Sequence, residues 1–337
     1  MIRALRFAVT GNRRPLFPIL ATMTSVDPAL LRDRARGCLL GQFIGDSLGS
    51  LVEFETPEQI AERYPDGVRD LADGGTWNLI AGQPTDDSQM AMMLIRSLQR
   101  RGTFDAEDVL RGYEHWYSTG PFDIGDTCAR ALRGAGPNED SQANGALMRV
   151  SPLGVFGARE GVGVDAAAGF AREDAALTHP NPICLDANAV YVAGLVTGIL
   201  GGTAKEVIDA MEAATSRQEV AQAIAAGRTG DVTAYEAHEG WVLLALSIAV
   251  RQLVLFDDPA EALVDAIGMG GDTDTNAAIA GALLGAVHGA GAWPQRWVTG
   301  VLECEPDEDR LDVVHPLGRE FWATDLLAQA DELAGVE

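Results

Sequence analysis

Lysine is almost absent from this sequence of 337 residues, since Lys205 is the single one and arginine supplies nearly all the positive charge. Acidic residues outnumber basic ones so strongly that the formal net charge is −24. Nonspecific binding to nucleic acid or to an anionic membrane depends on a positively charged surface. The composition therefore argues against both kinds of partner.

Cysteines and long apolar runs are also scarce. The sequence has four cysteines, Cys38, Cys128, Cys184 and Cys304. They are far apart and form no Cys-x-x-Cys pair, so we interpret them as free thiols of a reducing, cytoplasmic compartment. The apolar runs at 241–256 and 277–292 are shorter than the roughly 20 residues that cross a bilayer. We therefore expect no membrane span.

Residues 1–25 differ from the rest of the chain. They carry several arginines, and Gly11, Pro15 and Pro18 would interrupt any helix. They also lack the long apolar core of a secretory signal. We interpret them as a flexible arm in front of one domain over residues 26–337. The same features fit an upstream start codon with the natural start nearer Met23. A partner-binding arm is the alternative.

Alanine, glycine and helical periodicity dominate the remainder. Apolar residues make up 47% of the chain and aromatic residues only 6%, which favours closely packed helices over sheets. Asp27 followed by Pro28 is typical of a helix start. Helices are predicted over 27–54, 57–64, 86–101, 105–117, 126–132, 143–150, 164–177, 182–200, 204–214, 217–226, 234–255, 259–269, 273–290 and 319–333. No strand-length alternation is convincing, so the sequence predicts one compact all-α domain.

Two acidic clusters lie nearly two hundred residues apart, and each directly precedes a helical apolar run. Their candidate metal ligands are Thr85, Asp86, Asp87, Asp272, Asp274 and Thr275. One Asp or Thr is enough to cap a helix, so the second carboxylate of each cluster exceeds that need. Burying the excess charge is costly without a cation, and oxygen ligands suit hard divalent cations. If the clusters meet in space, they form a two-metal site.

The helix predicted after the second cluster carries Gly281, Gly285 and Gly289 at intervals of four residues. This spacing gives a smooth face that a neighbouring backbone can approach closely. We therefore expect this helix at the centre of a bundle, with its N-terminal carboxylates carried inward.

Glu53 is a third candidate, because it ends the first predicted helix, where negative charge is unfavourable. Asp46 lies two helical turns earlier on the same face and is expected to accept hydrogen bonds rather than bind metal. Glu53 and the four clustered aspartates would nearly neutralise two divalent cations. Since no His or Cys belongs to this set, Mg²⁺ or Mn²⁺ is expected over zinc.

These residues resemble those of the ADP-ribosylglycohydrolase family, which includes the dinitrogenase reductase-activating glycohydrolases. Five motifs carry the resemblance in order: GQFIGDSLG at 41–49, TDDSQM at 85–90, NGALMR at 144–149, THP at 178–180 and GGDTDT at 270–275. Five ordered motifs over most of the chain make the match specific. One departure is Ala143, where many members have glycine before the Asn-Gly pair.

The resemblance implies a compact orthogonal multi-helix bundle with a central dinuclear metal cleft for two Mg²⁺ or Mn²⁺ ions. It also implies hydrolytic release of ADP-ribose from an ADP-ribosylated target. It assigns the six candidate ligands to the metals, Glu53 to the family's catalytic or metal-bridging glutamate, and the loop before Asn144 to the diphosphate. The residues expected to contact substrate are Asp123, Gly125, Ser141, Asn144, Gly145 and His179.

The resulting hypothesis is a metal-dependent hydrolase of the glycosidic bond in an ADP-ribosyl conjugate, with Glu53 or Asp87 as the general base. Two alternatives remain: a two-metal phosphohydrolase of a nucleotide diphosphate, and a non-catalytic ADP-ribose-binding protein. The acceptor is open, since arginine, serine, a nucleobase or a small molecule could each carry the ADP-ribose. A monomer is expected.

Overall fold

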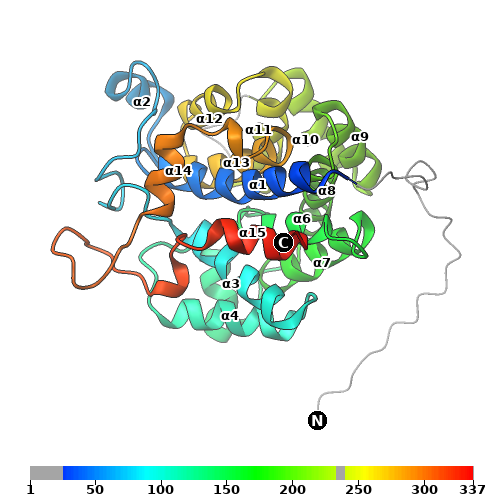
Figure 1. The fold of residues 1–337 in the computed structure, drawn as a ribbon, viewed down its shortest axis with the longest axis horizontal. Helices are drawn as coiled ribbons and strands as arrows, with labels where there is room; N and C mark the ends of the chain where they lie inside the picture. Colours follow the sequence, from blue (N-terminus) through cyan, green and yellow to red (C-terminus); the bar gives the residue numbers. More distant parts are fainter. Residues whose placement is uncertain (1–25, 233–239, 337) are drawn as a thin grey trace, which may run out of the picture.

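The computed structural model describes residues 26–232 and 240–336, and in these residues it contains fifteen α-helices and no β-strand (Figure 1). The all-α prediction is thus confirmed for the described chain, while the predicted arm at 1–25 lies outside it. The helices are α1 Pro28–Gly49, α2 Pro57–Arg63, α3 Asp86–Arg101, α4 Ala106–Ser118, α5 Asp126–Arg130, α6 Ser151–Gly157, α7 Val164–Thr178, α8 Pro182–Ile199, α9 Ala204–Ala214, α10 Gln218–Thr229, α11 Val242–Leu255, α12 Pro259–Gly268, α13 Thr273–His288, α14 Gln295–Leu302 and α15 Leu326–Ala334.

Some predicted helices are wrong. The segment 143–150 forms turns, because Ala143 pairs with Trp241 in an isolated bridge and the Asn144 N–H donates to the Gly240 carbonyl. The predicted helix over 319–333 is a short 3₁₀ turn, Arg319–Phe321, followed by α15. The helices α6 and α14 were not predicted, and α11 begins only at Val242, the residues 234–239 lying outside the described chain.

The central helix pair is α1 and α13, which run antiparallel with their glycines in register. Gly37, Gly41 and Gly45 of α1 face Gly285, Gly281 and Ala277 of α13 so closely that an added methyl group would overlap the opposite backbone. Thr273 through Ala286 are all buried, as the glycine spacing predicted. In Figure 1, α1 crosses the middle of the molecule between α13 and α15.

This register has a direct consequence for the acidic residues. Gly49 at the end of α1 lies against Thr273 at the start of α13, and the Thr273 hydroxyl donates to the Gly49 carbonyl over 2.7 Å. Glu53 follows α1 by four residues, Asp272 is the N-cap residue of α13, and Asp274 belongs to its first turn. The tight helix pair therefore brings these carboxylates together.

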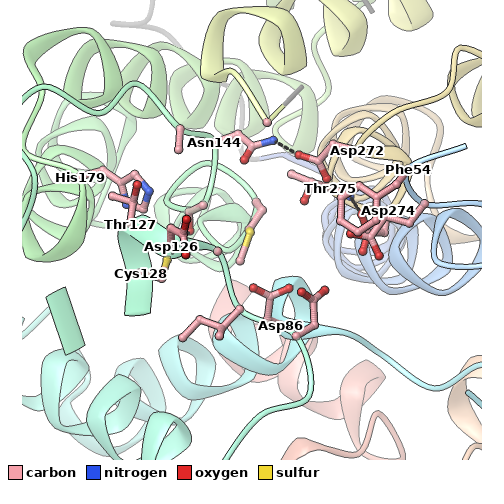
Figure 2. Close-up of a pocket in the computed structure, with 18 residues that line it drawn as sticks. Phe54, Asp86, Asp126, Thr127, Cys128, Asn144, His179, Asp272, Asp274 and Thr275 are labelled. Carbon is pink, nitrogen blue, oxygen red and sulfur yellow. Dashed lines mark hydrogen bonds between the residues drawn. The ribbon is translucent and has the colours of Figure 1, made fainter. Parts of the chain in front are cut away.

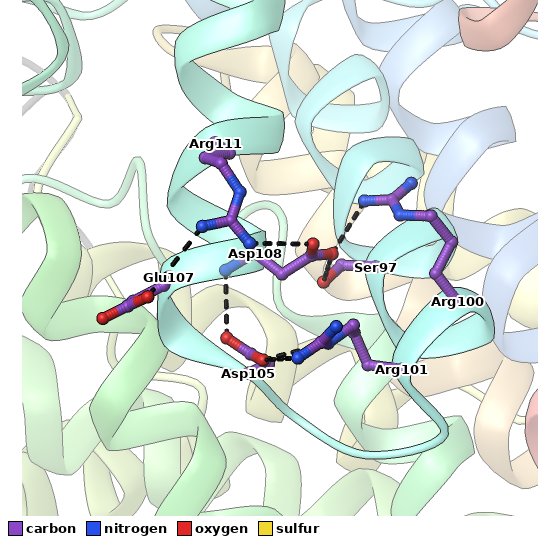
Figure 3. Close-up of polar contacts among 7 residues, drawn as sticks. All are labelled: Ser97, Arg100, Arg101, Asp105, Glu107, Asp108 and Arg111. Atoms are coloured by element: carbon purple, nitrogen blue, oxygen red, sulfur yellow. Dashed lines mark hydrogen bonds and ion pairs between the residues drawn. The ribbon is translucent and has the colours of Figure 1, made fainter.

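A polar corner joins the C-terminal end of α3 to the start of α4 (Figure 3). Asp105 caps α4 by accepting from the Asp108 N–H over 3.1 Å, and its carboxylate also accepts from Arg101. The Asp108 carboxylate accepts from Ser97 and Arg100, each over 2.8 Å. These contacts hold the C-terminal end of α3 against the first turn of α4.

Within the described residues, α8 is one helix that is long and apolar enough to cross a membrane by length and composition. Fourteen of its 18 residues are buried, and it packs against α6, α7, α9 and α13. Its place in the structure is therefore that of a core helix.

Candidate functional site

A cavity of about 440 Å³ opens where the first turns of α3 and α13 meet the loops that follow α1, α4 and α7. Figure 2 shows Asp272, Asp274 and Phe54 on one side of it and His179 and Cys128 on the other. Of the predicted site residues, Glu53, Asp86, Asp123, Gly125, Asn144, Gly145, His179, Asp272, Asp274 and Thr275 line the cavity. Asp86 of the first cluster and Asp272, Asp274 and Thr275 of the second cluster therefore face one space.

Three carboxylates form the tightest group in this cavity. Oxygens of Glu53, Asp123 and Asp274 all lie within 4.8 Å of one another. Asp123 was expected beside the substrate, and sequence reasoning did not place it in the acidic group. It follows α4 in a loop with no helical signal, so only tertiary structure brings it to Glu53.

The first cluster is anchored from another helix. The Asp46 carboxylate of α1 accepts the Thr85 N–H over 3.0 Å, the Thr85 hydroxyl over 2.9 Å and the Ser88 N–H over 3.1 Å. The helix α3 has no side-chain cap of its own. Asp46 therefore caps α3 from outside, which leaves Asp86 and Asp87 free of that task.

Asp87 connects the two clusters. Its Oδ2 accepts the Thr85 hydroxyl over 3.3 Å and the Thr275 hydroxyl over 3.4 Å. Its Oδ1 is buried and has no hydrogen-bond partner in the described structure. Thr85 and Asp87 lie behind the cavity wall, whereas Thr275 is part of that wall.

The buried carboxylates of the site disfavour ionisation in the absence of cations. Burial, together with the charges of Asp123 and Asp272, raises the pKa of Glu53 to about 9. Burial and the charge of Asp272 raise the pKa of Asp123 to about 7. Burial and neighbouring carboxylates also raise the pKa values of Asp86, Asp87 and Asp274 well above the usual range.

The oxygen atoms of these side chains are suitable ligands for divalent cations. Six acidic residues and no lysine or arginine occur among the described residues that line the cavity. An unpartnered buried carboxylate oxygen, as at Asp87, is costly unless a cation or donor satisfies it. Carboxylate and threonine oxygens without His or Cys suit Mg²⁺ or Mn²⁺.

The loop around Asn144 is held against the second cluster. The Asn144 amide donates to Asp272 over 2.6 Å, as Figure 2 shows, and its backbone N–H donates to Gly240. A side chain at Gly145 would meet Cys128 and His179 at 3.1 and 3.2 Å. Glycine at this position keeps the cavity open.

Ser141 was predicted to contact the substrate, but it does not line the cavity. Its hydroxyl forms a hydrogen bond with the Thr127 hydroxyl over 2.8 Å and accepts from the Ala143 N–H.

A buried ion pair supports this loop from behind. Arg149 is fully buried, donates to Asp174 over 3.1 Å and to the Gly145 carbonyl over 3.4 Å, and stacks over the Tyr113 ring at 4.3 Å. His179 lies in front of it, and burial together with the charge of Arg149 lowers its pKa to about 3. The imidazole is therefore neutral, and its buried Nε2 has no partner in the described structure.

Two residues next to Glu53 were missed by sequence reasoning. The Trp77 indole N–H donates to Glu53 Oε2 over 2.6 Å, although Trp77 lies in a loop that resembled no motif. Phe54 lines the cavity and is 53% exposed. An aromatic residue directly after a predicted site glutamate was the one signal in the sequence for Phe54.

Comparisons with known proteins agree with this geometry. A family model described as ADP-ribosylglycohydrolase matches residues 27–334. The chain is 31% identical over 279 residues to the ADP-ribosyl-[dinitrogen reductase] glycohydrolase of Rhodospirillum rubrum, covering 80% of this chain and 90% of that protein. It is 28% identical to the ADP-ribosylarginine hydrolase Tri1 of Pseudomonas putida, with 82% and 76% covered.

A solved structure shares the fold. It is described as an ADP-ribosylglycohydrolase-related protein complex, and it aligns with a TM-score of 0.72 at 28% sequence identity. The alignment covers 91% of this chain and 99% of that one.

Proposed function

The chain belongs to the ADP-ribosylglycohydrolase family, and from that premise we propose the cations, the general base and the acceptor of its reaction. Members of this family are metal-dependent hydrolases that remove ADP-ribose from modified targets. We propose that this chain uses two Mg²⁺ or Mn²⁺ ions and releases ADP-ribose from a guanidinium acceptor, as in an ADP-ribosylarginine. The observation that carries the proposal is a cavity wall rich in carboxylates and without described lysine or arginine.

The proposed cation ligands are Thr85, Asp86, Asp87, Asp272, Asp274 and Thr275. When bound, the ions would supply Lewis-acid and template chemistry to a sugar with vicinal hydroxyls. Asp46 positions the first three ligands through its hydrogen bonds to Thr85 and Ser88. Asn144 orients Asp272 through its amide donor.

Glu53 is the better candidate for the general base. Its carboxylate lines the cavity and is oriented by the Trp77 indole, whereas Asp87 lies behind the cavity wall and is engaged by two threonine hydroxyls. A base must lie within hydrogen-bonding reach of the water from which it takes a proton. Glu53 meets that requirement at the cavity surface, and Asp87 is proposed as a ligand.

The acceptor follows from charge. An ADP-ribosylated guanidinium carries a positive charge, while serine and nucleobase acceptors are neutral. Six acidic side chains line the cavity, and two of them, Asp123 and Asp126, do not belong to the set that would offset the charge of the cations. His179 remains neutral because its pKa is about 3. A positively charged acceptor is therefore favoured electrostatically. The relative named ADP-ribosylarginine hydrolase, which covers 82% of this chain, supports the same acceptor.

Turnover of defined conjugates tests the proposal. Release of ADP-ribose is measured by chromatography from ADP-ribosyl-L-arginine, an ADP-ribosylserine peptide and ADP-ribosylated thymidine, with Mg²⁺ or Mn²⁺ and with a chelator. We expect the arginine conjugate to be preferred, and Asp274→Ala and the chelator to abolish release. Asp209→Ala removes an exposed acid paired with Lys205 and serves as the control. Full activity in metal-free protein would overturn the cation assignment.

The same assay separates the two alternatives. A phosphohydrolase would yield AMP and a ribose phosphate instead of intact ADP-ribose. A non-catalytic binding protein would bind ADP-ribose tightly without turnover of any conjugate.

A further inference from the structure

Phe54 has a backbone conformation that aromatic residues rarely adopt. Its φ is 65°, in the left-handed region, and Asn78 is the other non-glycine residue with positive φ in the described chain. Asparagine tolerates this region, whereas a bulky side chain there is an outlier. Strain of this kind persists where the surrounding structure imposes it, commonly at functional sites.

The strain is imposed by hydrogen bonds to the loop of the second acidic cluster. The Phe54 N–H donates to the Gly271 carbonyl over 2.7 Å, and the Gly271 N–H donates to the Glu55 carbonyl over 3.0 Å. These bonds tie the turn after α1 to the loop that carries Asp272. As a result, both Glu53 and Phe54 line the cavity although they are consecutive.

The Phe54 ring is not a core residue. It is 53% exposed, and no aromatic ring of the described chain stacks on it, whereas Trp77 pairs with Phe122 at 5.9 Å. Packing therefore does not explain why a large apolar side chain is held in a strained turn at the cavity edge.

The position of the Phe54 ring in the cavity indicates which part of a bound substrate it would contact. Figure 2 shows Phe54 beside Asp274 and Thr275, across the cavity from His179. On the proposed function, the carboxylate side holds the ribose and the loop at Asn144 and Gly145 holds the diphosphate. The acceptor and the diphosphate are attached to opposite ends of that ribose. Phe54 lies on the ribose side and away from His179, so its ring is next to the acceptor.

We propose that Phe54 is a specificity-determining residue whose exposed ring stacks on the planar guanidinium of the acceptor. A guanidinium combines well with an aromatic face, because it is planar, cationic and weakly hydrated. Glu53 and Asp123 add negative charge near the same end of the cavity. This inference rests on the proposed function and identifies Phe54 as the residue that recognises the acceptor.

Four variants test it: Phe54→Ala, Phe54→Gly, Phe54→Tyr, and Leu255→Ala as a control in another half-exposed apolar residue. We expect Phe54→Ala and Phe54→Gly to lower kcat/KM for ADP-ribosyl-L-arginine by about tenfold, chiefly through KM. Phe54→Tyr and Leu255→Ala should keep the wild-type value. Inhibition by the product ADP-ribose should be unchanged in all four variants, because the ring contacts the acceptor.

Thermal unfolding distinguishes the loss of the aromatic ring from the relief of backbone strain at position 54. Both small variants lose the ring, but glycine adopts φ of 65° without strain and alanine adopts it only at a cost, so Phe54→Gly should melt above Phe54→Ala while losing the same activity. Unchanged kcat/KM in both variants, or equally weakened inhibition by ADP-ribose, would overturn the inference. Failure of the wild-type protein to turn over any conjugate would instead overturn the proposed function, and this inference with it.

Discussion

Gly281→Ala tests whether the close contact of α1 and α13 builds the site. The added methyl group would lie 2.8 Å from the carbonyl carbon of Gly41 and would overlap its oxygen. Non-bonded carbon atoms pack at about 3.5–4.0 Å, so the two helices must separate by about 1 Å. Neither atom belongs to a side chain that could rotate away, because both partners are backbone.

The magnitude follows from two opposing effects. Alanine gains about 1 kcal/mol over glycine inside a helix. Overpacking of a well-packed core costs typically about 1–3 kcal/mol, and a backbone contact belongs at the upper end of that range. Gly169→Ala in α7 gives the matched control, because a methyl group there has no neighbour within 4 Å. The control variant should gain only the stability of about 1 kcal/mol that alanine adds over glycine in a helix.

Thermal unfolding with and without Mg²⁺ measures the difference. At roughly 2 °C per kcal/mol, Gly281→Ala should melt about 6 °C below Gly169→Ala. Mg²⁺ should also raise the Tm of Gly281→Ala less than that of the control, since the shift of α13 displaces Asp272 and Asp274 from Glu53. Equal melting temperatures and equal Mg²⁺ responses in the two variants would refute this account of how the site is assembled.

Other expectations follow from the same contacts. With cations bound, Asp46→Asn should lower the free energy of unfolding by about 1–3 kcal/mol, because an amide oxygen cannot accept from all three donors at the start of α3. An unchanged free energy of unfolding in a denaturant titration would contradict the capping role of Asp46. Trp77→Phe should lower kcat about tenfold with little effect on stability, because it removes the hydrogen bond that orients Glu53, and steady-state kinetics would show it. Arg149→Leu should cost about 3–5 kcal/mol, because it leaves the Asp174 carboxylate buried and unpaired; a loss below about 1 kcal/mol would show that the pair is dispensable. In metal-free protein, the folded state keeps the Glu53 proton up to a pKa of about 9, while the unfolded state loses it near pH 4.5. The Tm should therefore fall as pH rises from about 4.5 to about 9. Added Mg²⁺ should raise the Tm most at the alkaline end of this range.

The motifs predicted much of the site because their residues act through local chemistry. Doubled carboxylates at two helix starts exceed the needs of capping, and the Gly281 and Gly285 spacing predicts a close helix contact. Both features are visible within a few residues of sequence. The predicted helix over 143–150 failed for the opposite reason: its residues are individually compatible with a helix, but the pairing of Ala143 with Trp241 competes with it.

The sequence by itself determined the all-α class, the chemical nature of the ligands and the family, since each depends on residue type and short-range spacing. Tertiary structure alone decided that Asp123 joins Glu53 and Asp274, that Asp46 caps a helix other than its own, and that Phe54 faces the cavity. The physical reason lies in the antiparallel register of α1 and α13, where paired glycines let two backbones touch. Contacts of that kind join residues more than two hundred positions apart, and no local pattern specifies which of them will meet.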